Sequence, residues 1–95
     1  MSHMKNKINF TRRKLDKLDN KLLDIIKRRT FLVNNILKNK KFKNQIVDKK
    51  RIDTILRNIK SKSIKKNIDP IVTKQIWKSM IKAFIDYEFR NFKKK

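Results

Sequence analysis

The sequence contains no cysteine and no glycine, and among its 95 residues there is one proline and one histidine. Without cysteine, the chain can hold neither a disulfide framework nor a thiolate metal site. Without glycine, the tight turns that join most β-hairpins lack their preferred residue. Because 38% of the residues are apolar and can fill a core, these absences predict one all-α domain.

Long hydrophobic runs are also missing. No stretch reaches the ~18 apolar residues that a membrane-spanning helix needs, and the N-terminus has no apolar segment typical of a signal peptide. We therefore expect no membrane association and a cytoplasmic location. The first four residues, MSHM, resemble a remnant of an expression tag. That interpretation puts the native start at Met4 and a single domain at residues 5–95.

The residues of the common catalytic sites are absent as well. The single histidine, His3, lies within the expected tag remnant. No Ser-His-Asp, Cys-His or metal-ligand grouping is possible, so we expect no metal and no cofactor. Any chemistry must then work through binding and electrostatics.

Acidic residues are scarce: 29 Lys and Arg face 8 Asp and Glu, which gives a formal charge of +21. Such a balance is typical of nucleic-acid binding, so a non-enzymatic basic helical protein is one alternative function. However, the lysines are spread over every segment, and no groove-reading motif is recognisable. We interpret the charge as a solvated surface without specific nucleic-acid binding, which would still concentrate a small dianion.

Residues 11–42 have the periodicity of one long amphipathic helix, with Thr11 as a plausible N-cap and residues 5–10 frayed. Its apolar positions recur at spacings of three and four: Leu15, Leu18, Leu22, Ile25, Ile26, Leu32, Val33 and Ile36. At about 100° per residue, Arg29 and Lys40 both fall inside this stripe. Because a buried cation without a partner is costly, the pattern predicts an anionic ligand.

This helix would be long for a domain of 95 residues. About thirty residues span roughly 45 Å, whereas a compact chain of this size is near 32 Å across. A second copy would cover the projecting apolar surface, so we expect an obligate homodimer. In that dimer Arg12 and Arg13 could reach the pocket of the partner.

Two further helices are expected. Residues 38–45 lose the helical periodicity and predict a loop, after which Asp48 is a candidate N-cap for a helix that fades through Ser61, Ser63 and the basic stretch of residues 65–67. The pair Asp69-Pro70 is a strong signal for the start of a third helix. Glu88, the only glutamate in the chain, continues the apolar side of that third helix and should face the core.

The inward-facing charges have two interpretations. In one, Arg29 and Glu88 form a buried ion pair, while Lys40 and Arg51 extend outward to solvent. In the other, Arg29, Lys40, Arg51 and a partner's Arg12 surround a ligand with two carboxylates. The surplus of cations over a single carboxylate favours the second interpretation.

Three runs carry a family resemblance: RRKLDKLDNKLLDIIKRRTFLVNNILKNK, VDKKRIDTIL and IDPIVTKQIWKSMIKAFIDYE. Over about residues 10–88 the chain resembles the all-helical (AroQ-class) chorismate mutase family. The resemblance implies three helices per subunit, with a long first helix, in an intertwined homodimer. It also implies two active sites, each completed by an arginine from the first helix of the partner.

By the same resemblance, the substrate is chorismate, which is rearranged to prephenate. Arg12 matches the arginine that acts across the interface, and Arg29 and Arg51 match arginines that bind the substrate carboxylates. Lys40 matches the lysine that contacts the ether oxygen. Asp48 matches the acidic residue at the start of the second helix, whose backbone helps to hold the substrate.

Three other positions bear on the reaction. Glu88 stands where most bacterial members have glutamine and the fungal branch has glutamate, and the resemblance puts it beside the ether oxygen. Ile52 replaces a glutamate that holds the ring hydroxyl, and Phe84 replaces a small hydroxyl residue. Both replacements resemble the isochorismate-pyruvate lyase branch, so conversion of isochorismate to salicylate and pyruvate is the alternative activity.

Overall fold

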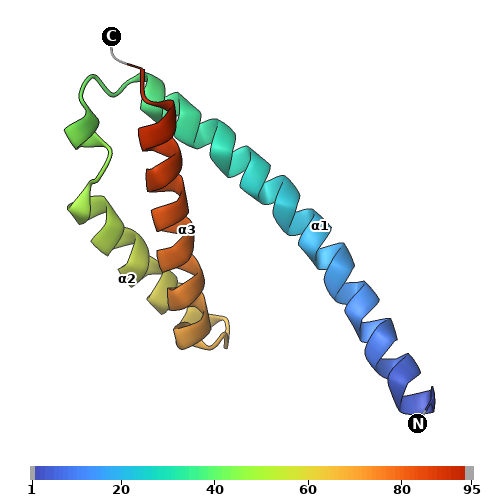
Figure 1. Cartoon of the computed structure of the whole chain (residues 1–95). Coiled ribbons are helices and arrows are strands. Elements are labelled where there is room, and N and C mark those ends of the chain that lie inside the picture. The colour runs from blue at the N-terminus through green and yellow to red at the C-terminus, as the bar shows by residue number, and fades with distance from the viewer. Residues whose placement is uncertain (1, 94–95) are drawn as a thin grey trace. The chain divides into compact units, whose positions relative to one another are not determined.

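The computed structural model describes residues 2–93, and throughout this range the regular secondary structure is helical. Three α-helices and one short 3-10 helix follow one another along the chain: α1 at Ser2–Lys38, η1 at Lys43–Gln45, α2 at Lys49–Lys65 and α3 at Pro70–Asn91 (Figure 1). The predicted all-α class and the three main helices are confirmed. Among the described residues, no helix combines the length and apolar character needed to cross a bilayer.

The chain divides into two structural units, Met1–Leu32 and Val33–Lys95. The first consists of the N-terminal part of α1. Its expected start at Thr11 is wrong, because α1 begins at Ser2 and residues 5–10 are helical. Thr11 is an interior residue whose Oγ1 donates a hydrogen bond to the carbonyl oxygen of Lys7 at 3.1 Å. A threonine hydroxyl can satisfy a carbonyl one turn back as readily as it caps a helix, so the cap signal was ambiguous.

The apolar stripe of α1 is exposed in the single chain. The exposed large side chains include Leu15, Leu18, Leu22, Ile25, Leu32 and Ile36. With 37 residues, α1 is about 55 Å long at 1.5 Å per residue. Such a continuous exposed apolar stripe is unusual for a helix that functions alone.

The α1 helix ends at Lys38, one turn earlier than the predicted end near residue 42. Lys40 therefore lies in the connecting segment and not in a last helical turn. The side chain of Gln45 holds this segment in shape: its Oε1 accepts hydrogen bonds from the backbone N–H groups of Lys41 at 2.7 Å and Phe42 at 2.9 Å. Ile46, which is 3% exposed, anchors the segment in the core.

The start of α2 agrees with the sequence: Asp48 is its N-cap, and its carboxylate accepts a hydrogen bond from the Arg51 backbone N–H at 3.0 Å. Its end at Lys65 also lies within the region where the helix was expected to fade. Asn67 closes the helix with a φ of 58°, a left-handed conformation that Asn tolerates better than most residues. The Ile68 N–H then bonds the Ser63 carbonyl at 2.9 Å, which ends the helix in a Schellman motif.

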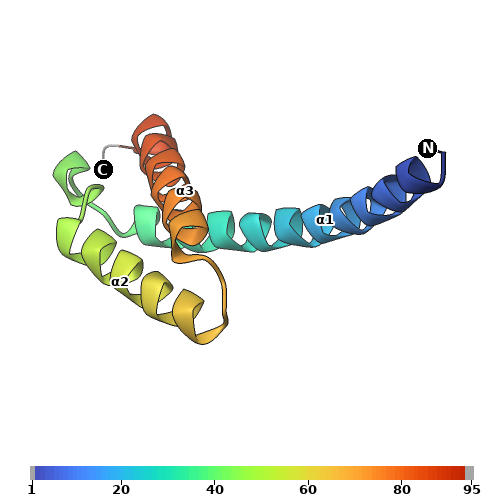
Figure 2. The same cartoon turned by 90° about the horizontal axis from the view of Figure 1, so that it is seen from below.

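Asp69 and Pro70 begin α3 as predicted, since the Asp69 carboxylate accepts from the Ile71 N–H at 2.9 Å. The α2 and α3 helices pack against each other as an antiparallel pair (Figure 1), and Figure 2 shows the loop that joins them. A buried hydroxyl pair joins them, with Ser63 Oγ 2.7 Å from Thr73 Oγ1. Leu37, Ile46 and Ile81 are the buried apolar residues of this C-terminal unit.

Candidate active site

The charged pair at the centre of the candidate site joins two segments that are far apart in the sequence. Lys40 follows the end of α1, and Glu88 lies near the end of α3. Lys40 Nζ donates a hydrogen bond to Glu88 Oε1 at 2.7 Å, and the two side chains are 17% and 10% exposed. At this distance and burial, the pair is a charge-assisted hydrogen bond with little screening by solvent.

The structure confirms that Glu88 faces the core, because the residue is only 7% exposed. It also corrects the alternative in which Lys40 extends outward, since the lysine ammonium lies against Glu88. A fixed ammonium beside a carboxylate can donate to an oxygen that gains negative charge during a reaction. The pair can thus act by electrostatic stabilisation, the kind of catalysis expected for a sequence without a nucleophile or a metal site.

Two contacts hold α3 in place beside this pair. The Tyr87 hydroxyl, adjacent in sequence to Glu88, donates to Asn34 Oδ1 at 3.0 Å. The Tyr87 ring also meets Phe84 edge to face, with the ring centroids 6.3 Å apart and the planes at 72°. The first contact fixes the last turns of α3 against the end of α1, and the second orients a predicted site residue.

Sequence reasoning missed Asn34, Tyr87 and Gln45. A pattern that could have indicated Gln45 is its position three residues after Phe42, the spacing at which a glutamine side chain reaches back to a helix start. The hydrogen bond between Tyr87 and Asn34 had no comparable signal, because it links residues 53 positions apart. Helical periodicity predicts which face a residue occupies but not its partner on another helix.

The other predicted residues of the C-terminal unit lie at the start of α2 and in the C-terminal half of α3. Asp48 and Arg51 are linked by the N-cap hydrogen bond, and the Arg51 side chain is exposed. Ile52 and Phe84 are half-buried on α2 and α3. Among the predicted site residues, Lys40 and Glu88 are joined by a direct side-chain contact.

Arg12 and Arg29 belong to the N-terminal unit. Arg12 is fully within α1 and exposed, whereas Arg29 is half-buried. Among the described residues, no group of three or more His, Cys, Asp and Glu side chains could hold a metal ion.

The sequence of the chain matches a known family. A protein-family model described as chorismate mutase type II matches residues 11–89. The chain belongs to the chorismate mutase type II family. This match contains all of α2 and most of α1 and α3, and it includes every predicted site residue from Arg12 to Glu88.

Membership in the chorismate mutase type II family supports a chorismate mutase type of activity and a chorismate-like substrate. It accounts for the all-helical architecture and confirms the family resemblance in the sequence. No curated protein and no solved structure matches the chain significantly.

Proposed function

We propose that this protein rearranges chorismate to prephenate, and that the partly buried pair of Lys40 and Glu88 is the centre of the site. The observation that carries this proposal is the 2.7 Å contact between Lys40 Nζ and Glu88 Oε1. The rearrangement is intramolecular and needs neither a nucleophile nor a cofactor. The protein has to bind a compressed conformer of the substrate and stabilise the charge that develops on the ether oxygen.

In this proposal substrate binding separates the two side chains, so that Lys40 donates to the ether oxygen from one side and Glu88, when protonated, donates from the other. Their burial supports these roles, because a donor that water cannot easily screen stabilises a developing charge more strongly. The Asn34–Tyr87 hydrogen bond and the Gln45-held segment keep the two donors on separate elements in position. Preorganisation of this kind lowers the barrier without a rearrangement at the moment of reaction.

The two substrate carboxylates are assigned to arginines. Arg29 and Arg51 bind them from the same chain, and Arg12 of the partner chain completes the site. Arginine suits this role because its planar guanidinium can bind a carboxylate through two parallel hydrogen bonds. Asp48 contributes through the backbone at the start of α2, where it is the N-cap.

The exposed apolar stripe of α1 supports a role for a partner chain. Leu18, Leu22 and Ile25 are each more than half exposed in the single chain, at 57%, 52% and 57%. Packing the first helices of two chains together would bury this stripe, and the hydrophobic effect would then stabilise the dimer. We propose an intertwined homodimer in which Arg12 acts across the interface.

A second activity, isochorismate-pyruvate lyase, is favoured by one specific observation. Ile52 and Phe84 are apolar and half-buried at the two positions where a mutase would use an acidic and a hydroxyl residue. An apolar side chain at position 52 cannot hold a ring hydroxyl by hydrogen bonding. The same cations would serve either reaction, since both substrates carry two carboxylates around one breaking ether bond.

The deciding experiment incubates the purified protein with chorismate and with isochorismate separately and identifies the products by chromatography. Prephenate from chorismate supports the mutase, whereas salicylate and pyruvate from isochorismate support the lyase. In either assay, Lys40→Met should lower kcat/KM by about 100-fold or more, because it removes a donor aimed at a developing charge. The exposed neighbour Lys41 provides a matched control, and Lys41→Met should leave kcat/KM within about twofold. If neither substrate is consumed, the proposed function is wrong.

A further inference from the structure

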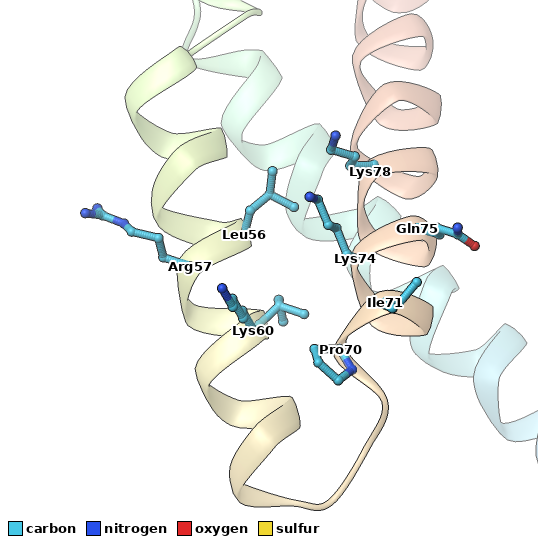
Figure 3. Close-up of a pocket in the computed structure, with 9 residues that line it drawn as sticks. Leu56, Arg57, Lys60, Pro70, Ile71, Lys74, Gln75 and Lys78 are labelled. Atoms are coloured by element: carbon cyan, nitrogen blue, oxygen red, sulfur yellow. The ribbon is translucent and has the colours of Figure 1, made fainter.

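A groove between α2 and α3 lies apart from the Lys40–Glu88 pair. It has a volume of about 640 Å³ and is open to solvent along one side. Its walls come from the C-terminal half of α2 and the first turns of α3 (Figure 3). The lining residues are Leu56, Arg57, Ile59, Lys60, Pro70, Ile71, Lys74, Gln75 and Lys78. None of these residues belongs to the predicted active site, so the groove is a separate feature of the surface.

The groove has an apolar base. Most of its lining surface is apolar, and the apolar lining residues are Leu56, Ile59, Pro70 and Ile71. Figure 3 shows Leu56 extending into the space between the two helices. Ile71 is 67% exposed, although it is a large aliphatic residue. Apolar area of this kind gains free energy when a ligand removes it from water.

The rim of the groove carries positive charge. Four of the nine lining residues are cationic and none is acidic. Lys74 extends into the groove beside Leu56, while Arg57 and Gln75 extend away from it on opposite sides (Figure 3). Among the described residues, no ion pair joins a carboxylate to Lys60, Lys74 or Lys78.

Charge complementarity therefore specifies the anionic part of the occupant, and the apolar base specifies the rest. We propose that this groove binds a small amphipathic anion: an apolar, ring-sized body against Leu56 and Ile71, with a carboxylate, sulfonate or phosphate reached by Lys60 and Lys74. A volume of about 640 Å³ is within the range of small-molecule sites, which are mostly apolar with a few polar groups that fix orientation. The proposal does not depend on the activity of the Lys40–Glu88 site.

The test uses a fluorescent probe of this chemistry, 8-anilinonaphthalene-1-sulfonate, and its uncharged counterpart N-phenyl-1-naphthylamine. Each is titrated into the full chain and followed by amide NMR shifts, which locate the binding. The sulfonate probe should shift the amides of residues 56–60 and 71–78 together, with one dissociation constant. The uncharged probe should bind with a dissociation constant at least about fivefold higher, because it lacks the group that the lysines attract.

Variants separate a specific site from general attraction to a basic surface. Lys60→Gln with Lys74→Gln removes two charges from the groove, and Lys62→Gln with Lys82→Gln removes two charges from exposed positions on the same helices outside it. The groove variant should weaken the sulfonate probe by about fivefold or more, and the control variant by less than about twofold. Circular dichroism checks that both variants keep their helices.

Three results would overturn the proposal. One is equal weakening in the groove and control variants, which would show attraction to net charge alone. Another is equal binding of the two probes, which would show an apolar surface without anion recognition. The third is an absence of shifts at residues 56–60 and 71–78 when the sulfonate probe is added. This result would overturn the proposal even if inorganic phosphate or a single-stranded oligonucleotide shifted the same amides.

Discussion

Lys40 Nζ and Glu88 Oε1 lie 2.7 Å apart and join the segment after α1 to the end of α3, across 48 residues of sequence. The buried end of this pair is the carboxylate, since Glu88 is 7% exposed as a residue. A carboxylate in that position has two possible effects on a neighbouring ether oxygen. It donates a hydrogen bond when protonated, and it repels developing negative charge when ionised.

Replacement of Glu88 by glutamine separates these two effects. If Glu88 donates to the ether oxygen, its ionised form cannot help, because a carboxylate has no proton to donate. The amide of Glu88→Gln always carries a donor, while its oxygen can still accept from Lys40. We expect the variant to have a higher kcat/KM than the wild type near neutral pH. A glutamine variant with the same or a lower kcat/KM would remove Glu88 from this role.

The hydrogen bond between Tyr87 and Asn34 should stabilise the fold near this pair. Tyr87→Phe removes only the hydroxyl, and we expect the free energy of unfolding to fall by about 0.5–1.5 kcal/mol. A double-mutant cycle with Asn34→Ala, followed by urea denaturation at one protein concentration, measures the coupling. Additive effects of the two substitutions would show that the contact contributes nothing to stability.

Local signals in the sequence were enough to predict where two of the helices begin. Asp48 and the Asp69-Pro70 pair cap α2 and α3 as expected, because an N-cap needs only a side chain and the next few backbone N–H groups. The first turn of α1 was wrong since Thr11 has an equally local alternative, a bond to the preceding turn. Both outcomes follow from interactions within four residues.

Longer-range features were harder to predict. Periodicity indicated that Glu88 faces the core, but the choice of Lys40 as its partner depends on the course of residues 39–48. That course is fixed by Gln45 and by the burial of Ile46, which have no periodic pattern. The family resemblance supplied the expected set of site residues. The structure adds a direct contact between two of them, Lys40 and Glu88.

The buried hydroxyl pair between α2 and α3 provides a test of packing away from the active site. Ser63 and Thr73 are 3% and 8% exposed, so the loss of one hydroxyl leaves the other with fewer partners in a dry environment. Thr73→Val should lower the free energy of unfolding by about 1–2 kcal/mol. Each kcal/mol lost should lower Tm by roughly 4–8 °C. The exposed Thr11 is the control, and Thr11→Val should change stability by less than about 0.5 kcal/mol. Equal effects at the two positions would contradict a specific role for the buried pair.

Position 52 should distinguish the two proposed activities. If the protein is a mutase that works without a contact to the ring hydroxyl, Ile52→Glu should improve chorismate turnover by supplying an acceptor. If it is a lyase, the same change should reduce isochorismate turnover, because it places an unpaired carboxylate in a half-buried apolar position. Ile52→Gln, which is polar but uncharged, controls for the change in size and polarity. Unchanged kcat/KM for both substrates in both variants would show that position 52 does not line the site.

Mixed dimers test the proposed action of Arg12 across the interface. Arg12→Ala and Arg29→Ala should each lower kcat/KM strongly, because each removes a charged contact worth about 2–4 kcal/mol. If one site combines Arg29 of one chain with Arg12 of its partner, a heterodimer of the two variants has one intact site. An equal mixture, refolded together from denaturant, should then recover about a quarter of the wild-type activity, because half of the dimers are mixed and half of their sites are intact.

The double variant Arg12→Ala with Arg29→Ala, refolded with wild type, provides the reverse experiment. When Arg12 acts across the interface, each site of this heterodimer lacks one arginine, so only the wild-type homodimers are active. When Arg12 acts within its own chain, the heterodimer keeps one intact site, and the mixture of single variants recovers nothing. The heterodimers of the two mixtures are therefore never both active: the position of Arg12 decides which of the two has an intact site. Activity in the double-variant heterodimer, together with none in the single-variant mixture, would show that the partner chain does not complete the site.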